Sequence, residues 1–288
     1  MHPLDGTIQV LLVCGGALYL AAGFAYLLRA HATRAWPVLF AIGWIVNASI
    51  FVLNGVVCGQ PPFGNMYHVQ VFLALCFLPL YLLVRKRDGL GFLVPHFSIA
   101  SALPLIGACF MERDIGWHRM PALQSPWFVP HVVGYMVSYA LATVAFAVAT
   151  STVALWAWRA WTKAGRPFSP AALLAMVASW RGTFTVAEFD PKACYRILLL
   201  GFPFMTFGLL SGALWAEEAW GVYWSWDSKE VWSLITWMLY LIYFHCRRSK
   251  RLRKYAMPAQ LLAFTALIVT FLLVNLLPKL GSALHSYS

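Results

Sequence analysis

The sequence predicts an all-α membrane protein of about eight transmembrane helices, with both termini on the outer face of the membrane. The first observation is the composition: 61% of the 288 residues are hydrophobic and only 11% are charged, whereas soluble domains carry roughly 25% charged residues. The second is a series of apolar runs long enough to cross a bilayer. The third is an uneven distribution of Lys and Arg between alternate loops. We expect residues 1–288 to form a single integral-membrane domain.

Runs of about 20 apolar residues define the expected spans, because a helix of that length crosses the hydrocarbon core. The third, fourth and seventh runs are short or interrupted, and the fifth is long enough to extend past the bilayer. The first span is expected to be retained, since no basic segment precedes it and no small-residue cleavage site follows closely. The expected spans are 7–28, 36–57, 66–84, 91–110, 128–158, 196–216, 230–246 and 257–277.

Loop charge sets the expected orientation, because Lys and Arg favour the cytoplasmic side. Most of the 21 Lys and Arg residues lie on one side of the expected spans, and that side includes 163–192, where 169–180 is expected to form a short helix on the membrane surface. The net charge of +11 therefore reflects topology and attraction to anionic lipid, and no nucleic-acid partner is expected. The cationic residues on the opposite side are Arg113, Arg119, Lys229 and Lys279.

The segment 215–237 is the most informative part of the sequence. Six tryptophans and a tyrosine fall within these 23 residues, where the sixth span ends and the seventh begins. A preference of Trp and Tyr for the membrane interface explains one or two of them. A dense cluster in one loop instead suits a large, flat, apolar ligand held by stacking and burial. The residues expected to hold it are Trp215, Trp220, Gly221, Tyr223, Trp224, Trp226, Asp227 and Trp232.

Asp227 and Glu230 form a predicted capping box in the same segment. A short acceptor at the N-cap and a Glu three residues later bind the free backbone N–H groups at a helix start. We therefore expect this pair to begin the seventh helix sharply and to pin the loop above it.

Two histidines are expected on the same side as the aromatic segment. His131 lies at the outer start of the fifth span, and His285 lies just past the outer end of the eighth. Two imidazoles beside an aromatic platform are typical of axial ligation of a haem iron, with the platform holding the porphyrin. Both are therefore candidate metal ligands. The other histidines comprise two weaker outer candidates, His68 and His118, and three without an assignment, His2, His31 and His96.

His245 is expected near the cytoplasmic end of the bilayer. It follows Glu230 by 15 residues on one expected helix, which places it roughly 22 Å deeper. Ionisable residues inside a membrane are candidates for functional sites. The alternative is a histidine at the headgroup level beside Arg247 and Arg248. Position alone leaves both interpretations open, and His245 is kept as a candidate metal ligand.

Several motifs resemble the CcsA (ResC) family of the type II cytochrome c biogenesis system. The strongest is residues 215–230 (WAEEAWGVYWSWDSKE), which is similar to the WWD motif of that family. The segments FDPKACYR, GFP, GLLSGAL and LITW around it extend the likeness from about residue 189 to 288. Residues 62–67 (PFGNMY) and the segment around His131 extend it more weakly, and residues 1–60 add mainly hydrophobicity.

The resemblance implies a set of ligands and partners. His131 and His285 match two external histidines that ligate the iron of haem b over the WWD motif, and His245 matches a histidine of an inner haem site. Apocytochrome c with its CxxCH motif and a separate CcsB/ResB-type membrane partner are implied. The implied location is the bacterial plasma (inner) membrane, with the Trp-rich loop and both termini on the periplasmic side. Ser228 departs from the family pattern, where proline is common, and so does His68, where an acidic residue is common.

The expected function is to bind haem on the outer face and present it for covalent attachment to apocytochrome c, after haem has passed through the membrane complex. The chain would then be a component of a cytochrome c haem lyase complex. Its part would be to orient the haem, because no nucleophile or general base stands out in the sequence. The alternatives are a haem exporter or chaperone without attachment activity, a haem-dependent regulator resembling HemX-type proteins, and a solute transporter, which the scarcity of acidic residues in the spans disfavours.

Overall fold

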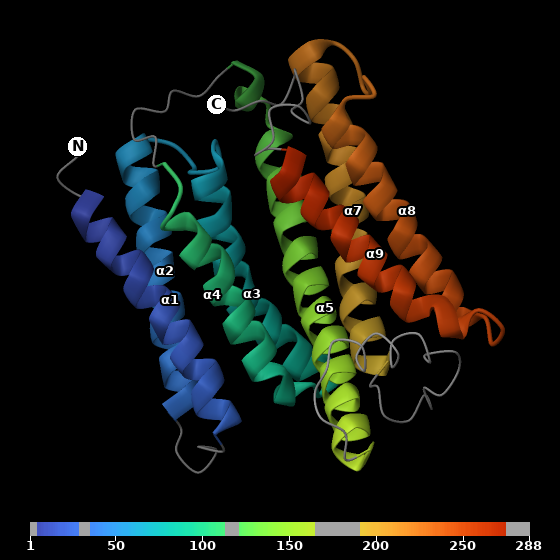
Figure 1. Ribbon diagram of the computed structural model, residues 1–288. Coiled ribbons are helices and arrows are strands. Elements are labelled where there is room, and N and C mark those ends of the chain that lie inside the picture. Colours follow the sequence, from blue (N-terminus) through green and yellow to red (C-terminus); the bar gives the residue numbers. More distant parts are fainter. Residues whose placement is uncertain (1–4, 29–34, 113–120, 165–190, 275–288) are drawn as a thin grey trace.

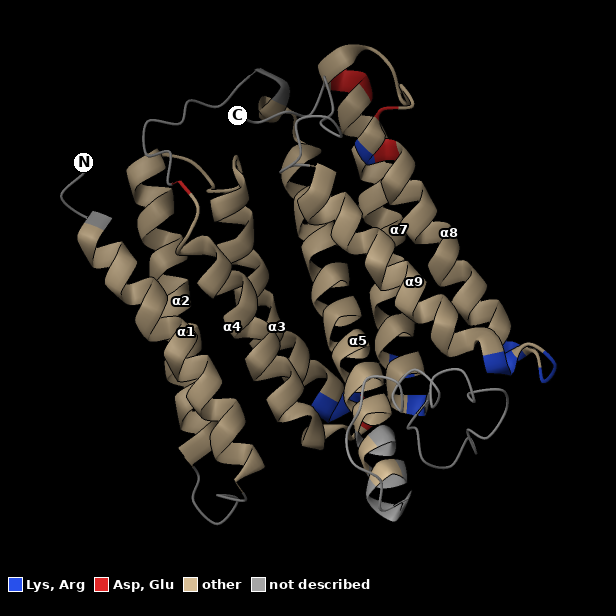
Figure 2. Cartoon of the chain, in the orientation of Figure 1, with Lys and Arg blue, Asp and Glu red and all other residues tan. Residues whose placement is uncertain are grey.

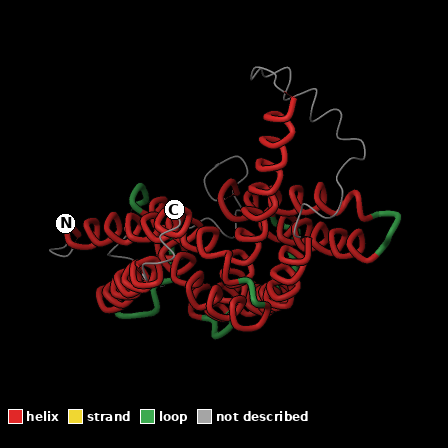
Figure 3. Tube along the Cα trace, turned by 90° about the horizontal axis from the view of Figure 1, so that it is seen from below, coloured by secondary structure: helices red, strands yellow, loops and turns green. Residues whose placement is uncertain are grey.

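The computed structural model describes residues 5–28, 35–112, 121–164 and 191–274, and within these ranges all the regular structure is helical (Figures 1 and 3). The expected surface helix over 169–180 lies outside the described residues. The long helices are α1 (Asp5–Leu27), α2 (Ala35–Cys58), α3 (Met66–Asp88), α4 (Val94–Ala108), α5 (Phe128–Ala164), α7 (Pro191–Trp220), α8 (Ser228–Arg248) and α9 (Ala256–Ile268). Short helical turns are Gly91–Leu93, Pro121–Gln124, Arg253–Tyr255 and Val269–Leu273.

The expected multi-pass membrane architecture is confirmed. Seven of the described helices are long and apolar enough to span a bilayer, and each coincides with an expected span. The expected length of the fifth span is also confirmed, since α5 has 37 residues. The seventh expected span forms α8, which has 21 residues but is not among the seven. Ser, Thr, Trp and Tyr residues along α8, with charged residues at its ends, lower its mean hydropathy.

The helices form two groups that meet at α5. In the first group, α1 packs against α2 and α4, and α3 packs against α2 and α4. In the second group, α5 packs against α7, and α8 packs against α9 (Figure 1). Contacts of α5 with α3 and α4 join the two groups. Residues that are far apart in the sequence are thereby brought to one end of the molecule.

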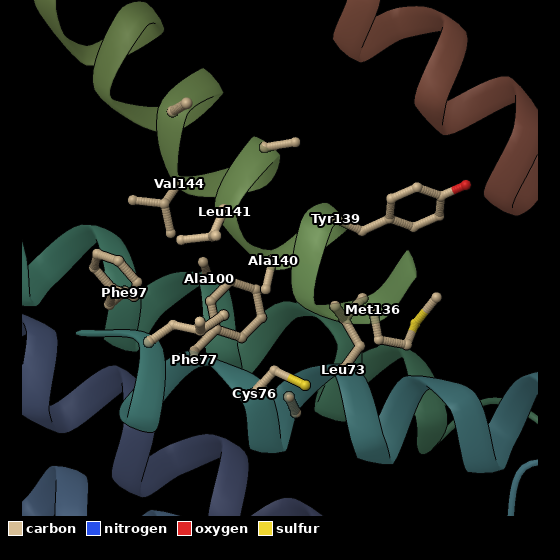
Figure 4. Packing of buried hydrophobic residues seen from close by; sticks show 14 of the residues in the cluster. Leu73, Cys76, Phe77, Phe97, Ala100, Met136, Tyr139, Ala140, Leu141 and Val144 are labelled. Carbon is tan, nitrogen blue, oxygen red and sulfur yellow. The ribbon is translucent and has the colours of Figure 1, made fainter. Parts of the chain in front are cut away.

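The junction between the groups is a close-packed apolar core. Phe77 of α3 and Phe97 of α4 lie against Leu141 and Val144 of α5 (Figure 4), and all four are buried. Small residues such as Ala140 allow the helix backbones to approach each other closely. Because lipid offers no hydrophobic driving force between helices, van der Waals packing of this kind holds them together. The packing fixes α5, which carries His131, relative to α3.

Charged residues of the described part are segregated along the helix axes (Figure 2). Lys and Arg gather where α3 ends, where α7 begins, and between α8 and α9, and one acidic residue, Asp88, lies among them at the end of α3. Glu217, Glu218, Asp227 and Glu230 lie at the opposite end, together with Lys229. This segregation is the one that the sequence predicted, and the side of the membrane that each end faces stays a prediction.

Candidate ligand pocket at the tryptophan-rich loop

A pocket opens beside the tryptophan-rich loop, between the starts of α3, α5 and α8, the last half of α7 and the turn after α9. It contains about 1030 Å³ of atom-free space, including its opening to solvent. The walls are mainly apolar and aromatic with a few polar groups, which is typical of sites for organic ligands. The lining residues include Phe63, Asn65, Met66, Phe128, His131, Tyr135, Met136, Tyr139, Gly212, Trp215, Tyr223, Trp224, Lys229, Glu230, Ser233 and Phe271.

His131, in the first turn of α5, is held in one orientation on the pocket wall. Its Nδ1 lies 2.8 Å from the backbone oxygen of Gly208, and since a carbonyl only accepts, Nδ1 carries the proton and donates. The lone pair of the neutral ring is then on Nε2. A metal-binding histidine is usually oriented by a hydrogen bond from its second ring nitrogen to a carboxylate, a backbone carbonyl or water. The geometry therefore suits Nε2 as a metal ligand.

Two aromatic rings contact the His131 imidazole. Trp215 lies with its ring centroid 5.4 Å away at an interplanar angle of 38°, and Tyr135 makes an edge-to-face contact at 5.0 Å. Trp215 is itself buried, in contact with Phe128 and Trp220. These contacts leave the imidazole little freedom to rotate.

Gly212 is required where α7 passes the imidazole. A Cβ at this position would lie 2.7 Å from both Nδ1 and Cε1 of His131, closer than carbon atoms approach without strain. Gly208, one helical turn earlier, supplies the carbonyl acceptor for His131. The two glycines share one face of α7, and that face is where α5 approaches.

The tryptophan-rich loop leaves α7 through a glycine and reaches α8 in seven residues. Gly221 has φ +74° and its N–H donates to the backbone oxygen of Glu217 at 2.8 Å, as expected of a helix-ending glycine. Trp226 also has a positive φ, +61°, which is unusual for a residue with a side chain and tends to occur at functional sites. Its side chain is 72% exposed.

Asp227 and Glu230 form the capping box that the sequence predicted. The Asp227 carboxylate accepts from the backbone N–H of Lys229 at 3.3 Å, and the Glu230 carboxylate accepts from the N–H of Asp227 at 3.2 Å. Glu230 also accepts from the N–H of Ser225 at 2.8 Å and from its hydroxyl at 3.1 Å. Glu230 thus ties the loop to the first turn of α8, at the edge of the pocket.

Lys229 brings a positive charge to the pocket wall. Burial lowers the pKa of its ammonium group from the ordinary 10.5 to about 8, and the nearby Asp227 carboxylate offsets only part of this effect. Transfer of a charged group out of water disfavours its ionised form unless a counter-charge compensates.

The structure brings part of the predicted set together. His131, Trp215, Tyr223 and Trp224 line the pocket. The other predicted residues support the loop or lie beside it: Trp220 packs on Trp215 with ring centroids 5.0 Å apart, Gly221 and Asp227 shape the loop ends, and Trp226 and Trp232 are outside the pocket lining found in the described residues.

The remaining predicted histidines are elsewhere. His245 is exposed in the last turn of α8, at the end opposite the pocket, and the unbroken helix between them preserves the expected separation from Glu230. His285 and His118 lie outside the described residues. His68 is buried in the first turn of α3, where its Nε2 lies 3.9 Å from Sγ of Cys58, and it is not among the lining residues.

Several lining residues were not predicted as site residues. Phe63 and Asn65, from the loop before α3, and Met66, its first residue, form a wall of the pocket, although the segment 62–67 had been noted for its resemblance. The side chain of Asn65 also caps α3 by accepting from the N–H of His68 at 2.9 Å. Lys229, which the distribution of Lys and Arg between the loops assigned to the outer side, lines the pocket as well.

A family model and several known proteins that match this chain all concern cytochrome c assembly. A family model described as "Cytochrome C assembly protein" matches residues 63–281. Cytochrome c biogenesis protein CcsA of Synechocystis sp. is 32% identical, with 92% of each chain covered. The chain belongs to the cytochrome c assembly protein family. CcsA of Mesostigma viride is 34% identical over 78% of this chain and 77% of its own length, and CcsA of Chlamydomonas reinhardtii is 36% identical over 80% of this chain.

The family match has a structural counterpart. It begins at Phe63, which lines the pocket, and every lining residue in the described part of the chain falls within 63–281. Helices α1 and α2 lie outside it. This chain spans only 61% of the length of the Chlamydomonas relative, but it covers most of the other two.

Proposed function

We propose that this chain binds haem b in the pocket beside the tryptophan-rich loop and presents it for covalent attachment to apocytochrome c. One observation carries the proposal: an imidazole with its Nδ1 proton fixed by a backbone carbonyl lines a mainly apolar and aromatic pocket. The family to which the chain belongs consists of cytochrome c assembly proteins, which agrees with a haem-sized ligand.

The residues of the pocket divide the task. His131 ligates the iron through Nε2, and Gly208 and Trp215 keep the imidazole in place. Tyr223 and Trp224, which reach the pocket from the loop, cover the porphyrin by stacking and by excluding water. His285 is the proposed second axial ligand, and it lies outside the described residues. Two imidazole ligands would keep oxygen from the iron.

The bond-forming step needs little from this chain beyond position. A cysteine thiol of the apocytochrome CxxCH motif adds across a haem vinyl group, so that a carbon–sulfur bond forms and the thiol hydrogen passes to the neighbouring vinyl carbon. A ligand held in one orientation makes this addition effectively intramolecular. The chain would act as a component of a haem lyase complex by fixing the haem and exposing its vinyl groups.

The proposed setting is the bacterial plasma membrane, with the pocket on the outer, periplasmic side. The gathering of Lys and Arg at the other end of the helices supports this orientation (Figure 2). A CcsB/ResB-type membrane protein is the proposed partner. We infer that His245, which is exposed on α8 near the basic end, contributes to an inner haem site shared with such a partner, from which haem would reach the outer pocket.

Cytochrome c maturation in cells that depend on this chain tests the proposal. His131→Ala should abolish covalent haem attachment, and imidazole in the medium should restore part of it, because free imidazole can occupy the vacated axial position. Normal maturation in the His131→Ala cells would refute the proposed site. If wild-type cells deliver haem to the periplasm but this chain forms no thioether bonds there, the result would instead support a haem exporter.

A further inference from the structure

The pocket wall contains two ionised side chains among the described lining residues, Lys229 and Glu230, both in the first turn of α8. The rest of the lining consists of apolar, aromatic and neutral polar groups. A charge in such surroundings interacts strongly with any charge that a ligand brings, because water screens it poorly. The two charges therefore bear on which ligand the pocket accepts and how the ligand is oriented.

The Glu230 carboxylate is already engaged by the loop. It accepts hydrogen bonds from the N–H and hydroxyl of Ser225 and from the N–H of Asp227. Three donors on one carboxylate satisfy most of its capacity, and they stabilise its negative charge within the loop. Glu230 is thus a structural anion whose charge is balanced by backbone and hydroxyl dipoles.

Lys229 is the second charged side chain of the described pocket wall. Asp227 attracts it, but burial has the larger effect and lowers the pKa of Lys229 to about 8. The Asp227 carboxylate also accepts from the backbone N–H of Lys229 in its capping role. Lys229 is the cation that an anionic group of a ligand would meet among the described lining residues.

We propose that the Lys229 ammonium group binds a propionate carboxylate of haem and so determines which edge of the ring enters the pocket first. This inference rests on the proposed function. Haem is a flat apolar ring with two propionates on one edge, and it matches a pocket with apolar walls and one cation at a particular place. The propionate edge then faces the start of α8, and the vinyl edge, which lies across the ring, points away from Lys229.

A comparison of two ligands tests this pairing. The purified full-length chain is titrated with haem and with haem dimethyl ester, in which both propionates are masked, and the change in absorbance gives each dissociation constant. Wild-type protein should bind haem roughly tenfold or more tightly than the ester, as expected for a charge-assisted hydrogen bond. Lys229→Met should lose most of this preference, and Lys229→Arg should keep it. Lys250→Met, which removes a cation from the turn at the other end of α8, is the control and should keep it too.

The outcomes separate the inference from the function on which it rests. Wild-type protein that binds both ligands equally, or a Lys229→Met variant with an unchanged preference, would overturn the Lys229 inference and leave haem binding intact. Wild-type protein that binds neither ligand would overturn the proposed function as well. The comparison of haem with its dimethyl ester on wild-type protein needs no substitution, so it tests the inference even if Lys229→Met fails to fold.

Discussion

Gly212→Ala is the most direct test of how α7 positions His131. The added Cβ would lie 2.7 Å from Nδ1 and Cε1 of the imidazole, whereas ordinary contact begins at 3.4 Å. The ring would therefore have to move away from α7 by about 0.7 Å. Because the acceptor of the Nδ1 proton, Gly208, is also on α7, the 2.8 Å hydrogen bond would lengthen to roughly 3.5 Å, beyond the useful range.

The expected loss follows from these distances. Removing the group that orients a metal-binding histidine typically lowers affinity by about 10- to 100-fold, and overpacking at this site should lower the free energy of unfolding by about 1–3 kcal/mol. Titration of the purified variant with haem measures the first effect, and thermal unfolding measures the second. We expect a 10- to 100-fold increase in the haem dissociation constant with a moderate decrease in Tm.

Gly23→Ala is the matched control for this substitution. Its Cβ would lie 2.8 Å from Cγ1 of Ile99, a similar overlap between α1 and α4, away from the pocket. It should lower Tm by a similar amount without changing haem affinity. If Gly212→Ala binds haem like the wild type, or if both variants lose affinity equally, the role assigned to the His131–α7 contact is wrong.

Three further predictions concern other parts of the chain. Trp224→Ala should raise the haem dissociation constant roughly tenfold, since Trp224 lines the pocket, and the exposed Trp226 should tolerate Ala better; equal effects would contradict this. Because the pKa of Lys229 is lowered from 10.5 to about 8, the unfolded chain binds more protons between these values, so the Tm of the ligand-free wild type should rise relative to Lys229→Met over that interval. His245→Ala should leave the haem affinity of the isolated chain unchanged and lower haem content only when the partner is present. A lower haem affinity of the isolated variant would instead indicate that His245 belongs to the outer site.

The order and approximate bounds of the helices were predictable because each depends on local sequence. Apolar runs of membrane length predicted the spans, and Asp227 with Glu230 predicted the start of α8, where the structure has both hydrogen bonds of the capping box. The hydropathy of α8 is the exception, since its aromatic and hydroxyl-bearing residues make it less apolar than the other spans. Some of these residues face neighbouring helices, since Thr236 and Tyr240 are buried.

The pocket was only partly predictable, because its walls come from segments that are distant in the sequence. Nothing local indicates that Phe63 and Phe271 share a pocket with His131, since helix packing alone brings them together. Trp232 is outside the pocket lining found in the described residues, although it follows Lys229, a lining residue, by three positions on α8 and therefore shares a helix face with it. Its part in the site stays a prediction.

The central claim is that His131 ligates haem iron in this pocket, and the absorption spectrum of the purified chain tests it most directly. The wild-type chain loaded with haem should have the spectrum of a low-spin haem with two nitrogen ligands. His131→Ala should lose that spectrum and regain it when imidazole is added, because imidazole can fill the vacant axial position. A His131→Ala spectrum identical to that of the wild type, without added imidazole, would contradict the account.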